Sequence, residues 1–201
     1  MRSIAKLMKD WQFTGPNGVT TAVELPHTWN AKDGQDGGND YWRGCCTYCT
    51  RFAAPVYDPA QQQVWLQFEG VNASAAVLLN GQQLCTHDGG YSTFRAEVTE
   101  LLQAENQLTV RVDNSVNDRV YPQKADFTFY GGIYRDVSLL VVNKNHIALG
   151  HFGDTGVKIT PTLKEGSADI RVETLVEGSG TVTVELLDAE GYEAVVAAEE
   201  A

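Results

Sequence analysis

Apolar residues recur at every second position over much of this chain, and short turns rich in glycine and asparagine interrupt them. Segments 64–69 and 108–113 both follow this alternation. The pair Asn80-Gly81, which sits between the apolar runs 75–79 and 84–85, is the strongest short hairpin signal in the chain. Only residues 98–102 are typical of a helical turn. A period of two indicates strands that bury one face, so we expect an all-β protein built as a sandwich or jelly roll.

A polar break at residues 143–146 divides this pattern into two parts. Residues 134–142 are apolar on both faces, as a central strand would be. We expect residues 1–142 to form a jelly-roll β-sandwich and residues 143–146 to form a linker. Residues 147–201 carry four further strand patterns at regular spacing, which favours an immunoglobulin-like β-sandwich. Such a sandwich has about seven strands, so we expect this second one to be partial and truncated.

Charge argues against several classes of partner. The net charge is −11, and binding to the phosphates of a nucleic acid requires clustered lysine and arginine. Residues 147–201 hold 11 acidic and 3 basic side chains, so most of the excess lies there. No run of about 18 apolar residues is present, so no membrane span is expected. The first ten residues lack the apolar centre of a secretory signal, which makes the cytoplasm the expected compartment.

The cysteines do not form a recognisable metal site. Cys46 and Cys49 have the spacing of half a zinc site, but neither Cys45 nor Cys85 completes a second pair at a matching interval. On a strand, Cys46 and Cys49 would point to opposite faces. We therefore interpret all four as reduced structural thiols rather than as a metal or redox centre.

Several loop motifs lie between the expected strands. In chain order they are Pro26–Asn30, Tyr41–Gly44, Phe68–Val71, His87–Tyr91, Val112–Asn114 and Tyr130–Val137. In composition and order they resemble the N-terminal sugar-binding domain of glycoside hydrolase family 2, the family of β-galactosidases and β-glucuronidases. The resemblance covers nearly all of residues 1–142 and implies a galactose-binding-domain-like jelly roll. An immunoglobulin-like domain in second place also matches this family.

The resemblance implies that the chemistry of catalysis lies outside this chain. In this family the catalytic carboxylates belong to a later barrel domain, where the acid/base glutamate follows an asparagine. The chain has no Asn-Glu dipeptide and no βα repeat, so we expect no catalytic residue in it. The expected function is the non-catalytic N-terminal part of a retaining exo-β-glycosidase. It would support the barrel domain and lend a loop to the site that binds the β-linked sugar.

Asp88 is the leading candidate for contact with that sugar. Gly89 and Gly90 allow a tight turn beside it, and a carboxylate accepts hydrogen bonds from two neighbouring hydroxyl groups. The resemblance implies that the matching aspartate of β-galactosidases contacts the galactose ring, in some members alongside a monovalent cation. We therefore expect a β-galactosidase in preference to a β-glucuronidase. The alternative is a turn aspartate that caps its own backbone.

His87 is the second substrate-binding candidate, because its ring could donate a hydrogen bond to a sugar hydroxyl. A solvent-exposed loop histidine is the alternative. Four aromatic residues could stack on the face of a pyranose, although core packing is the favoured interpretation of each. They are Trp29, Tyr41, Trp42 and Tyr91.

The polar segment 33–40 interleaves oxygen ligands and glycines but does not fit the calcium-loop template. It is interpreted as an ordered loop near the sugar site or as a solvated turn. No metal site or cofactor is expected in this chain. Residues 130–137 are interpreted as architecture that holds the first domain against the barrel.

Two other functions stay open. A free-standing carbohydrate-binding module would bind saccharides through residues 1–142 in isolation. A structural or oligomer-forming domain would use Asp88 for stability or assembly rather than for sugar preference. A homo-oligomer is a possible assembly of this chain.

Overall fold

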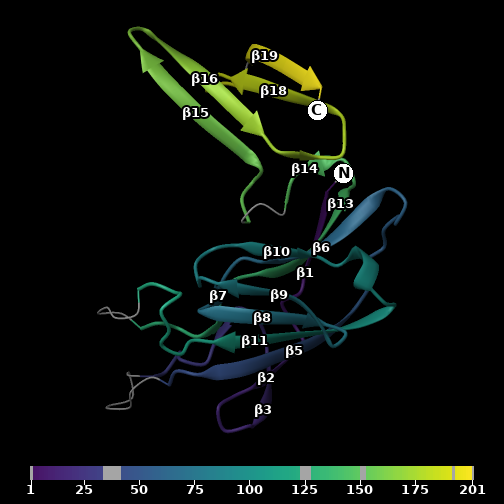
Figure 1. Cartoon of the computed structure of the whole chain (residues 1–201), viewed down its shortest axis with the longest axis vertical. Helices are drawn as coiled ribbons and strands as arrows, with labels where there is room; N and C mark the ends of the chain where they lie inside the picture. Colours follow the sequence, from purple (N-terminus) through teal and green to yellow (C-terminus); the bar gives the residue numbers. More distant parts are fainter. Residues whose placement is uncertain (1, 34–41, 123–127, 150–152, 192, 201) are drawn as a thin grey trace.

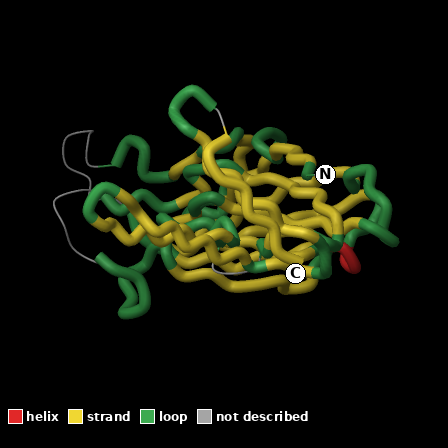
Figure 2. The backbone as a smooth tube through the Cα atoms, turned by 90° about the horizontal axis from the view of Figure 1, so that it is seen from above, coloured by secondary structure: helices red, strands yellow, loops and turns green. Residues whose placement is uncertain are grey.

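The computed structural model describes residues 2–33, 42–122, 128–149, 153–191 and 193–200. Within these ranges the regular elements are strands β1 to β19 and one short 3₁₀ turn, η1 (Thr99–Leu101). Figure 2 shows strands joined by loops and turns, with the single helical turn at one edge. The expectations of an all-β fold and of one helical turn at residues 98–102 are confirmed. Among the described residues, no helix is long and apolar enough to cross a membrane.

Two antiparallel sheets form the layers of a sandwich (Figure 1). The four-stranded sheet has the order β1 (Ser3–Lys6), β13 (Val137–Asn143), β6 (Gln62–Phe68) and β10 (Phe94–Glu97). The six-stranded sheet has the order β3 (Thr20–Val23), β2 (Trp11–Thr14), β5 (Cys45–Ala53), β11 (Glu105–Asp113), β8 (Ser74–Leu79) and β9 (Gln82–Asp88). A small third sheet joins β4 (His27–Thr28), β12 (Gly132–Ile133) and β7 (Val71–Asn72).

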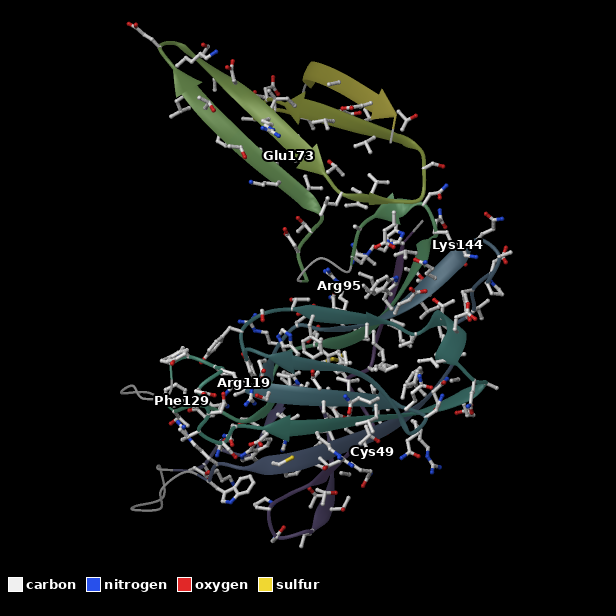
Figure 3. The ribbon with its side chains drawn as sticks, in the orientation of Figure 1. Cys49, Arg95, Arg119, Phe129, Lys144 and Glu173 are labelled. Atoms are coloured by element: carbon white, nitrogen blue, oxygen red, sulfur yellow. The ribbon has the colours of Figure 1, made fainter. Side chains whose placement is uncertain are left out.

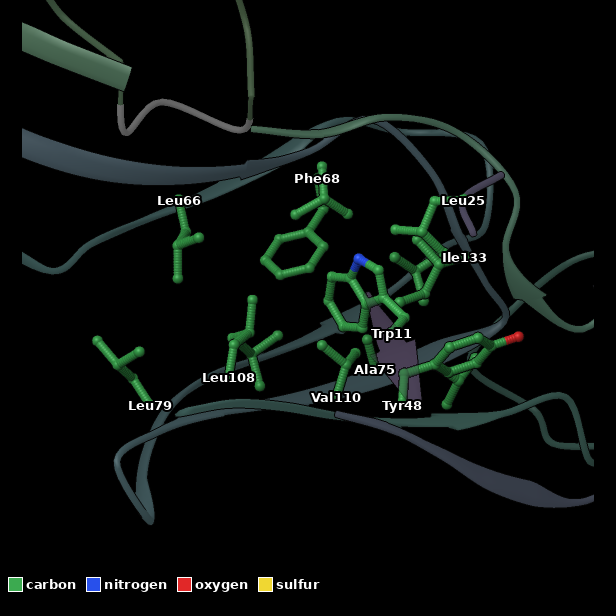
Figure 4. Close-up of a cluster of buried hydrophobic side chains, with 14 of the residues drawn as sticks. Trp11, Leu25, Tyr48, Leu66, Phe68, Ala75, Leu79, Leu108, Val110 and Ile133 are labelled. Carbon is green, nitrogen blue, oxygen red and sulfur yellow. The ribbon is translucent and has the colours of Figure 1, made fainter. Parts of the chain in front are cut away.

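The core lies between the two large sheets, and large side chains fill it (Figure 4). Trp11, Tyr48 and Phe68 are fully buried there. On β5, burial alternates with a period of two, so Tyr48 points inward while its neighbours on the strand point away. Full burial of one large apolar side chain stabilises a fold by about 1.5–3 kcal/mol. The alternation seen in the sequence therefore determines which face of each strand meets the core.

Strand β13 is apolar on both faces because both faces are covered. It pairs with β1 on one side and β6 on the other. Leu139 and Val141 join the main core, whereas Leu140 and Val142 pack in a second cluster with Trp65. The prediction of a central strand at residues 134–142 is thus confirmed over Val137–Val142.

The hairpin predicted at Asn80-Gly81 joins β8 to β9. Asn80 has φ 52° and Gly81 has φ 83°, the left-handed values that a two-residue turn of this type requires. The side chain of Asn80 also donates to the carbonyl of Leu101 at 3.1 Å and to Oδ1 of Asn106 at 3.0 Å. The turn is therefore held by its backbone preference and by two contacts to the neighbouring strand connection.

Cys46 and Cys49 lie on opposite faces of β5, as predicted. Cys46 is buried, and burial raises the pKa of its thiol to about 12. All four thiols are free. A thiol with so high a pKa stays protonated at neutral pH and is a poor nucleophile and metal ligand. Cys46 therefore acts as a small apolar core residue.

In the part of the chain that the structure describes, the strands that follow β13 pair two by two. The pairs are β14 (His146–Ile147) with β17 (Val176–Glu177), β15 (Val157–Lys164) with β16 (Ser167–Thr174), and β18 (Thr181–Leu187) with β19 (Glu193–Glu200). They stand beyond one face of the sandwich, at the top of Figure 1. Their strand rhythm is the one expected for residues 147–201. The division at residues 143–146 stays a prediction.

Arg95 connects the sandwich to the segment that follows β14. Its Nη1 donates to the carbonyls of Leu149 and Asp154, both at 2.9 Å, while its Nε donates to Oε1 of Gln67 at 2.7 Å. Figure 3 shows Arg95 at the junction between the two regions. One guanidinium group thus ties β10 and β6 to the connection that leads into β15.

Candidate functional site

Most of the sequence motifs meet at one end of the sandwich, at the left of Figure 1, where the connections between strands gather. The small sheet β4–β12–β7 brings His27-Thr28 and Gly132-Ile133 beside Val71-Asn72. These segments are more than 40 residues apart in sequence. Tertiary pairing therefore assembles the motifs into one structure.

A buried asparagine organises this end. Asn30 has no exposed surface. Its Nδ2 donates to Oδ2 of Asp33 and to the carbonyl of Trp42, both at 2.8 Å, and its Oδ1 accepts from the backbone N–H of Gly131 at 2.7 Å. A buried amide with every atom paired stabilises one loop conformation over others.

Asn114 extends the same network. It is buried, and its Nδ2 donates to Oδ1 of Asn30 and to the carbonyl of Phe129, both at 3.2 Å. Its Oδ1 accepts from the backbone N–H of Gly44 at 2.9 Å. The two asparagines thus lock together the segments that contain residues 30–33, 42–44, 114 and 129–131.

Close packing explains the glycine pair in the segment 130–137. A Cβ on Gly131 would collide with the ring of Trp29 and with the side-chain amide of Asn114. Gly132 has φ 135° and lies against the carbonyl of His27. Asp136 in this segment forms an ion pair with Lys6 at 2.6 Å. The segment is architectural within this chain.

Asp88 ends β9 and is held by two other elements. Ser74 Oγ donates to its Oδ1, and Arg119 Nε donates to its Oδ2 at 2.9 Å. These hydrogen bonds, first that of Ser74 and then that of Arg119, lower the pKa of Asp88 below its ordinary value. The carboxylate is ionised at neutral pH, and 41% of the side chain is exposed. Its bonded partners come from other elements rather than from its own turn.

His87 points away from Asp88, because adjacent residues of a strand face opposite sides. Its ring stacks on Phe94 with centroids 4.2 Å apart. Its Nε2 lies 3.1 Å from the carbonyl oxygen of Gly89 and 3.0 Å from Oγ of Ser92. Burial lowers the pKa of His87. The ring is half-buried and engaged, so the structure does not bring the two candidates together, and contact of either one with a sugar stays a prediction.

A shallow cleft lies at this end, and we call it the end cleft. Its lining residues are Arg43, Asn72, Ala73, Tyr91, Asn114, Ser115, Val120, Tyr121, Pro122 and Phe129. Tyr91 is 55% exposed and Tyr121 is 76% exposed. Exposed aromatic rings beside a cleft suit the apolar face of a sugar ring.

The other aromatic candidates have different surroundings. Trp29 stacks on Phe13 with centroids 6.0 Å apart, and both Trp29 and Trp42 pack against the main core. Core packing, the favoured interpretation, is the one that their contacts support. Tyr41 and most of the predicted loop at residues 33–40 lie outside the described residues, and Asp33 accepts from the backbone N–H of Trp42 at 3.0 Å.

Two residues of this end escaped the sequence analysis. Arg119 pairs with Asp88, which is 31 positions earlier in the chain, and Tyr121 lines the end cleft. No local pattern signals a pairing over that distance. A tyrosine directly before a proline, in a polar segment after a strand, was the available signal for Tyr121.

Among the described residues, no cluster of three or more histidine, cysteine or acidic side chains is arranged to hold a metal ion. At this end Asp88 forms an ion pair with Arg119, and the guanidinium of Arg43 makes a cation–π contact, 4.7 Å from the ring centroid of Phe129. The chemistry that this end offers is hydrogen bonding and aromatic stacking.

The family model described as "Glycosyl hydrolase 2 galactose-binding domain-like" matches residues 37–162. A β-glucuronidase from Bacteroides fragilis is 37% identical over 75% of this chain and 22% of its own length. A β-galactosidase from Thermoanaerobacter pseudethanolicus is 31% identical over 65% of this chain and 18% of its own length.

Among solved structures, the FMN-binding β-glucuronidase from Facaelibacterium prausnitzii L2-6 superposes on the whole chain with a TM-score of 0.92 and 36% identity. The match covers 32% of that structure. The chain thus spans about a fifth of the length of these curated relatives and about a third of the solved structure. It belongs to the galactose-binding-like domains of glycoside hydrolase family 2 and corresponds to the N-terminal part of that family's β-glycosidases.

Proposed function

We propose that this chain is the non-catalytic N-terminal part of a larger retaining β-glycosidase, in which it supports a barrel domain and supplies loops to the sugar site. The observation that carries this proposal is the loop end locked by Asn30 and Asn114. A surface that completes a site on another domain must hold its side chains in fixed positions before the sugar arrives. The buried amide network supplies that rigidity beside the exposed Tyr91 and Tyr121.

We favour β-glucuronidase activity for the whole protein, with β-galactosidase activity as the second candidate. The relatives at 37% and 36% identity are named β-glucuronidases, and the β-galactosidase described above is at 31%. The preference for a β-galactosidase depended on Asp88. The carboxylate of Asp88 already has partners on both oxygens within this chain, which weakens that reason.

Activity of the full-length protein tests the proposal. We expect hydrolysis of p-nitrophenyl β-D-glucuronide at a higher kcat/KM than of p-nitrophenyl β-D-galactoside, with the β configuration retained in the first product seen by NMR. A higher kcat/KM for the galactoside would establish the second candidate. The proposal is overturned if the protein hydrolyses neither of these compounds and no other β-linked nitrophenyl glycoside. Comparing the rate of hydrolysis in sodium and in potassium buffers tests whether the monovalent cation that the resemblance implies takes part.

A free-standing carbohydrate-binding module predicts a different result. Isothermal titration of the 201-residue chain with methyl β-D-glucuronide and methyl β-D-galactoside measures it directly. We expect no saturable binding, because the chain would supply only part of the pocket. Saturable binding would favour the module, and a concentration-dependent oligomer in sedimentation would favour the structural or oligomer-forming domain.

Direct contact with the sugar, which the resemblance implies for Asp88 and which the ring chemistry allows for His87, has a test of its own. Replacing Asp88 by Asn in the full-length protein keeps the shape of the side chain and removes its charge. A direct contact predicts a changed ratio of kcat/KM between the two glycosides. Replacing His87 by Gln gives the equivalent test for the imidazole.

A further inference from the structure

The ion pair between Asp88 and Arg119 joins two loops that line the same cleft. Asp88 lies three residues before Tyr91, and Arg119 lies two residues before Tyr121. Both tyrosines line the end cleft. Ser74 adds a third point of attachment, because it is the cross-strand partner of Asp88 and donates to its Oδ1. We call Ser74, Asp88 and Arg119 the clamp.

The Arg119 side of the clamp is a turn with its own internal order. Asn117 Oδ1 accepts from the backbone N–H of Arg119 at 2.9 Å and of Val120 at 3.1 Å. Val120 is buried. Residues 119–121 are therefore fixed relative to each other. A displacement of Arg119 consequently also displaces Tyr121, which lines the end cleft. Figure 3 shows Arg119 and Phe129 at the same end of the sandwich.

The Asp88 side is attached just as firmly. Asp88 belongs to β9, whose pairing with β8 fixes its backbone. Beyond it, the carbonyl of Gly90 accepts a hydrogen bond from the hydroxyl of Tyr134, and a Cβ on Gly90 would collide with Asn72. The two sides of the clamp thus belong to separately ordered segments. Within the described residues, the side chains of Asp88 and Arg119 link these two segments directly.

We propose that the clamp is a positioning device that sets the distance between the Tyr91 and Tyr121 loops at the end cleft, so that Asp88 acts on the sugar site through Arg119 and not by touching the sugar. The effect of the clamp on hydrolysis rests on the proposed function. Its effect on the order of the Tyr121 loop does not depend on that function. The pair is exposed on both sides, 58% for Arg119 and 41% for Asp88. Its contribution to global stability is therefore small, whereas its effect on the local geometry is direct.

Hydrogen exchange of the 201-residue chain tests the clamp without any activity. Replacing Arg119 by Ala is expected to raise exchange of the amides of residues 117–121 about threefold, as loss of an exposed ion pair allows. Replacing Asp88 by Asn should have the same effect. Arg171→Ala is the matched control, because Arg171 also forms an exposed ion pair, with Glu173, outside the sandwich. Unchanged exchange in both clamp variants would overturn the proposal.

A charge swap separates positioning from direct contact. In the full-length protein, Arg119→Ala and Asp88→Arg should each raise KM for the better of the two nitrophenyl glycosides, with kcat nearly unchanged. Combining Asp88→Arg with Arg119→Asp should restore KM toward the wild-type value, because the pair is rebuilt in reverse. A KM that rises with Asp88→Asn but not with Arg119→Ala would show direct contact and overturn the clamp.

Failure of the proposed function gives a different pattern. If the wild-type full-length protein cleaves neither glycoside, the proposed function fails, and the exchange of residues 117–121 still decides whether the clamp exists. If the wild type is active but neither exchange nor KM responds to Arg119→Ala, the clamp fails and the proposed function stands. Melting temperatures of all variants, compared with Arg171→Ala, identify any that do not fold.

Discussion

Apolar residues recur at every second position both in the sandwich up to Asn143 and in the strands from His146 onward. These side chains are buried in the sandwich and largely exposed in the later strands. On β11, every second residue is buried, and Leu108, Val110 and Val112 have no exposed surface. On β15, residues 158–164 are all exposed, and Leu163 is 84% exposed. A period of two therefore identifies a strand but does not say whether a second layer covers its apolar face.

This difference concentrates the stability of the chain in the first region. Burial of apolar surface stabilises a fold by about 25 cal/mol for each Å² removed from water. The main core and the second cluster both lie within β1–β13 and the short segment that follows it, up to Leu149. We expect the strands from β15 onward to open more readily to hydrogen exchange than β5, β6 and β11.

Truncating one leucine in each region is the largest test of this comparison. Leu108→Ala should lower the free energy of unfolding by about 2–5 kcal/mol, because it leaves a cavity in the core. Leu163→Ala should change it by about 0.5 kcal/mol or less, since the side chain lies in solvent. Urea unfolding followed by tryptophan fluorescence measures both. Equal losses would mean that Leu163 is covered in solution.

Replacing one asparagine by alanine in each region should give losses of stability that differ almost as much as those of the two leucines. Asn30→Ala leaves the buried backbone N–H of Gly131 without its partner and removes one of the two hydrogen bonds to the carbonyl of Trp42, and should cost about 2–3 kcal/mol. Asn145→Ala removes only a long, exposed contact to the backbone N–H of Ser179 and should cost little. Thermal unfolding of both variants checks this. A loss at Asn145 that matched the one at Asn30 would contradict the comparison.

Replacing one glycine by alanine in each region separates the cost of close packing from the cost of backbone strain. Gly131→Ala should cost about 1–3 kcal/mol, because the added methyl group must displace Trp29 or Asn114. Gly166→Ala, in the β15–β16 turn, meets open space but has φ 74°, so only backbone strain of about 1–2 kcal/mol applies. The difference should appear as lost near-ultraviolet circular dichroism in the first variant alone. Wild-type-like spectra and stability for Gly131→Ala would refute the packing account.

The smallest expected effect is a pH dependence confined to the sandwich. Burial lowers the pKa of His27, whose Nδ1 lies 2.7 Å from the hydroxyl of Tyr48, and burial also lowers that of His87. As pH falls through about 6.5, the unfolded chain takes up protons that the folded chain does not, so stability decreases. His27→Gln should reduce this slope in urea midpoints measured from about pH 7.5 to 5.5. A slope unchanged by this substitution would assign the effect to other groups.

The fold was predictable where local pattern decides it. Alternation located the strands, two apolar faces identified β13 as central, and Asn80-Gly81 identified the hairpin. The candidate site was only partly predictable. The loop motifs were visible and do meet at one end, but the partners of Asp88 were not, because Ser74 and Arg119 come from a neighbouring strand and a distant loop.

The strands, the turns and the family can be derived from the order of amino acids, since each depends on neighbours within a few positions or on motifs in a fixed order. Which polar residues meet depends instead on the packing of distant segments. Asn30 and Asn114 are 84 residues apart and Asp88 and Arg119 are 31 apart, yet both pairs are in hydrogen-bonding contact. Contacts over such distances depend on how the sheets stack and where the loops cross, and no local propensity carries that information.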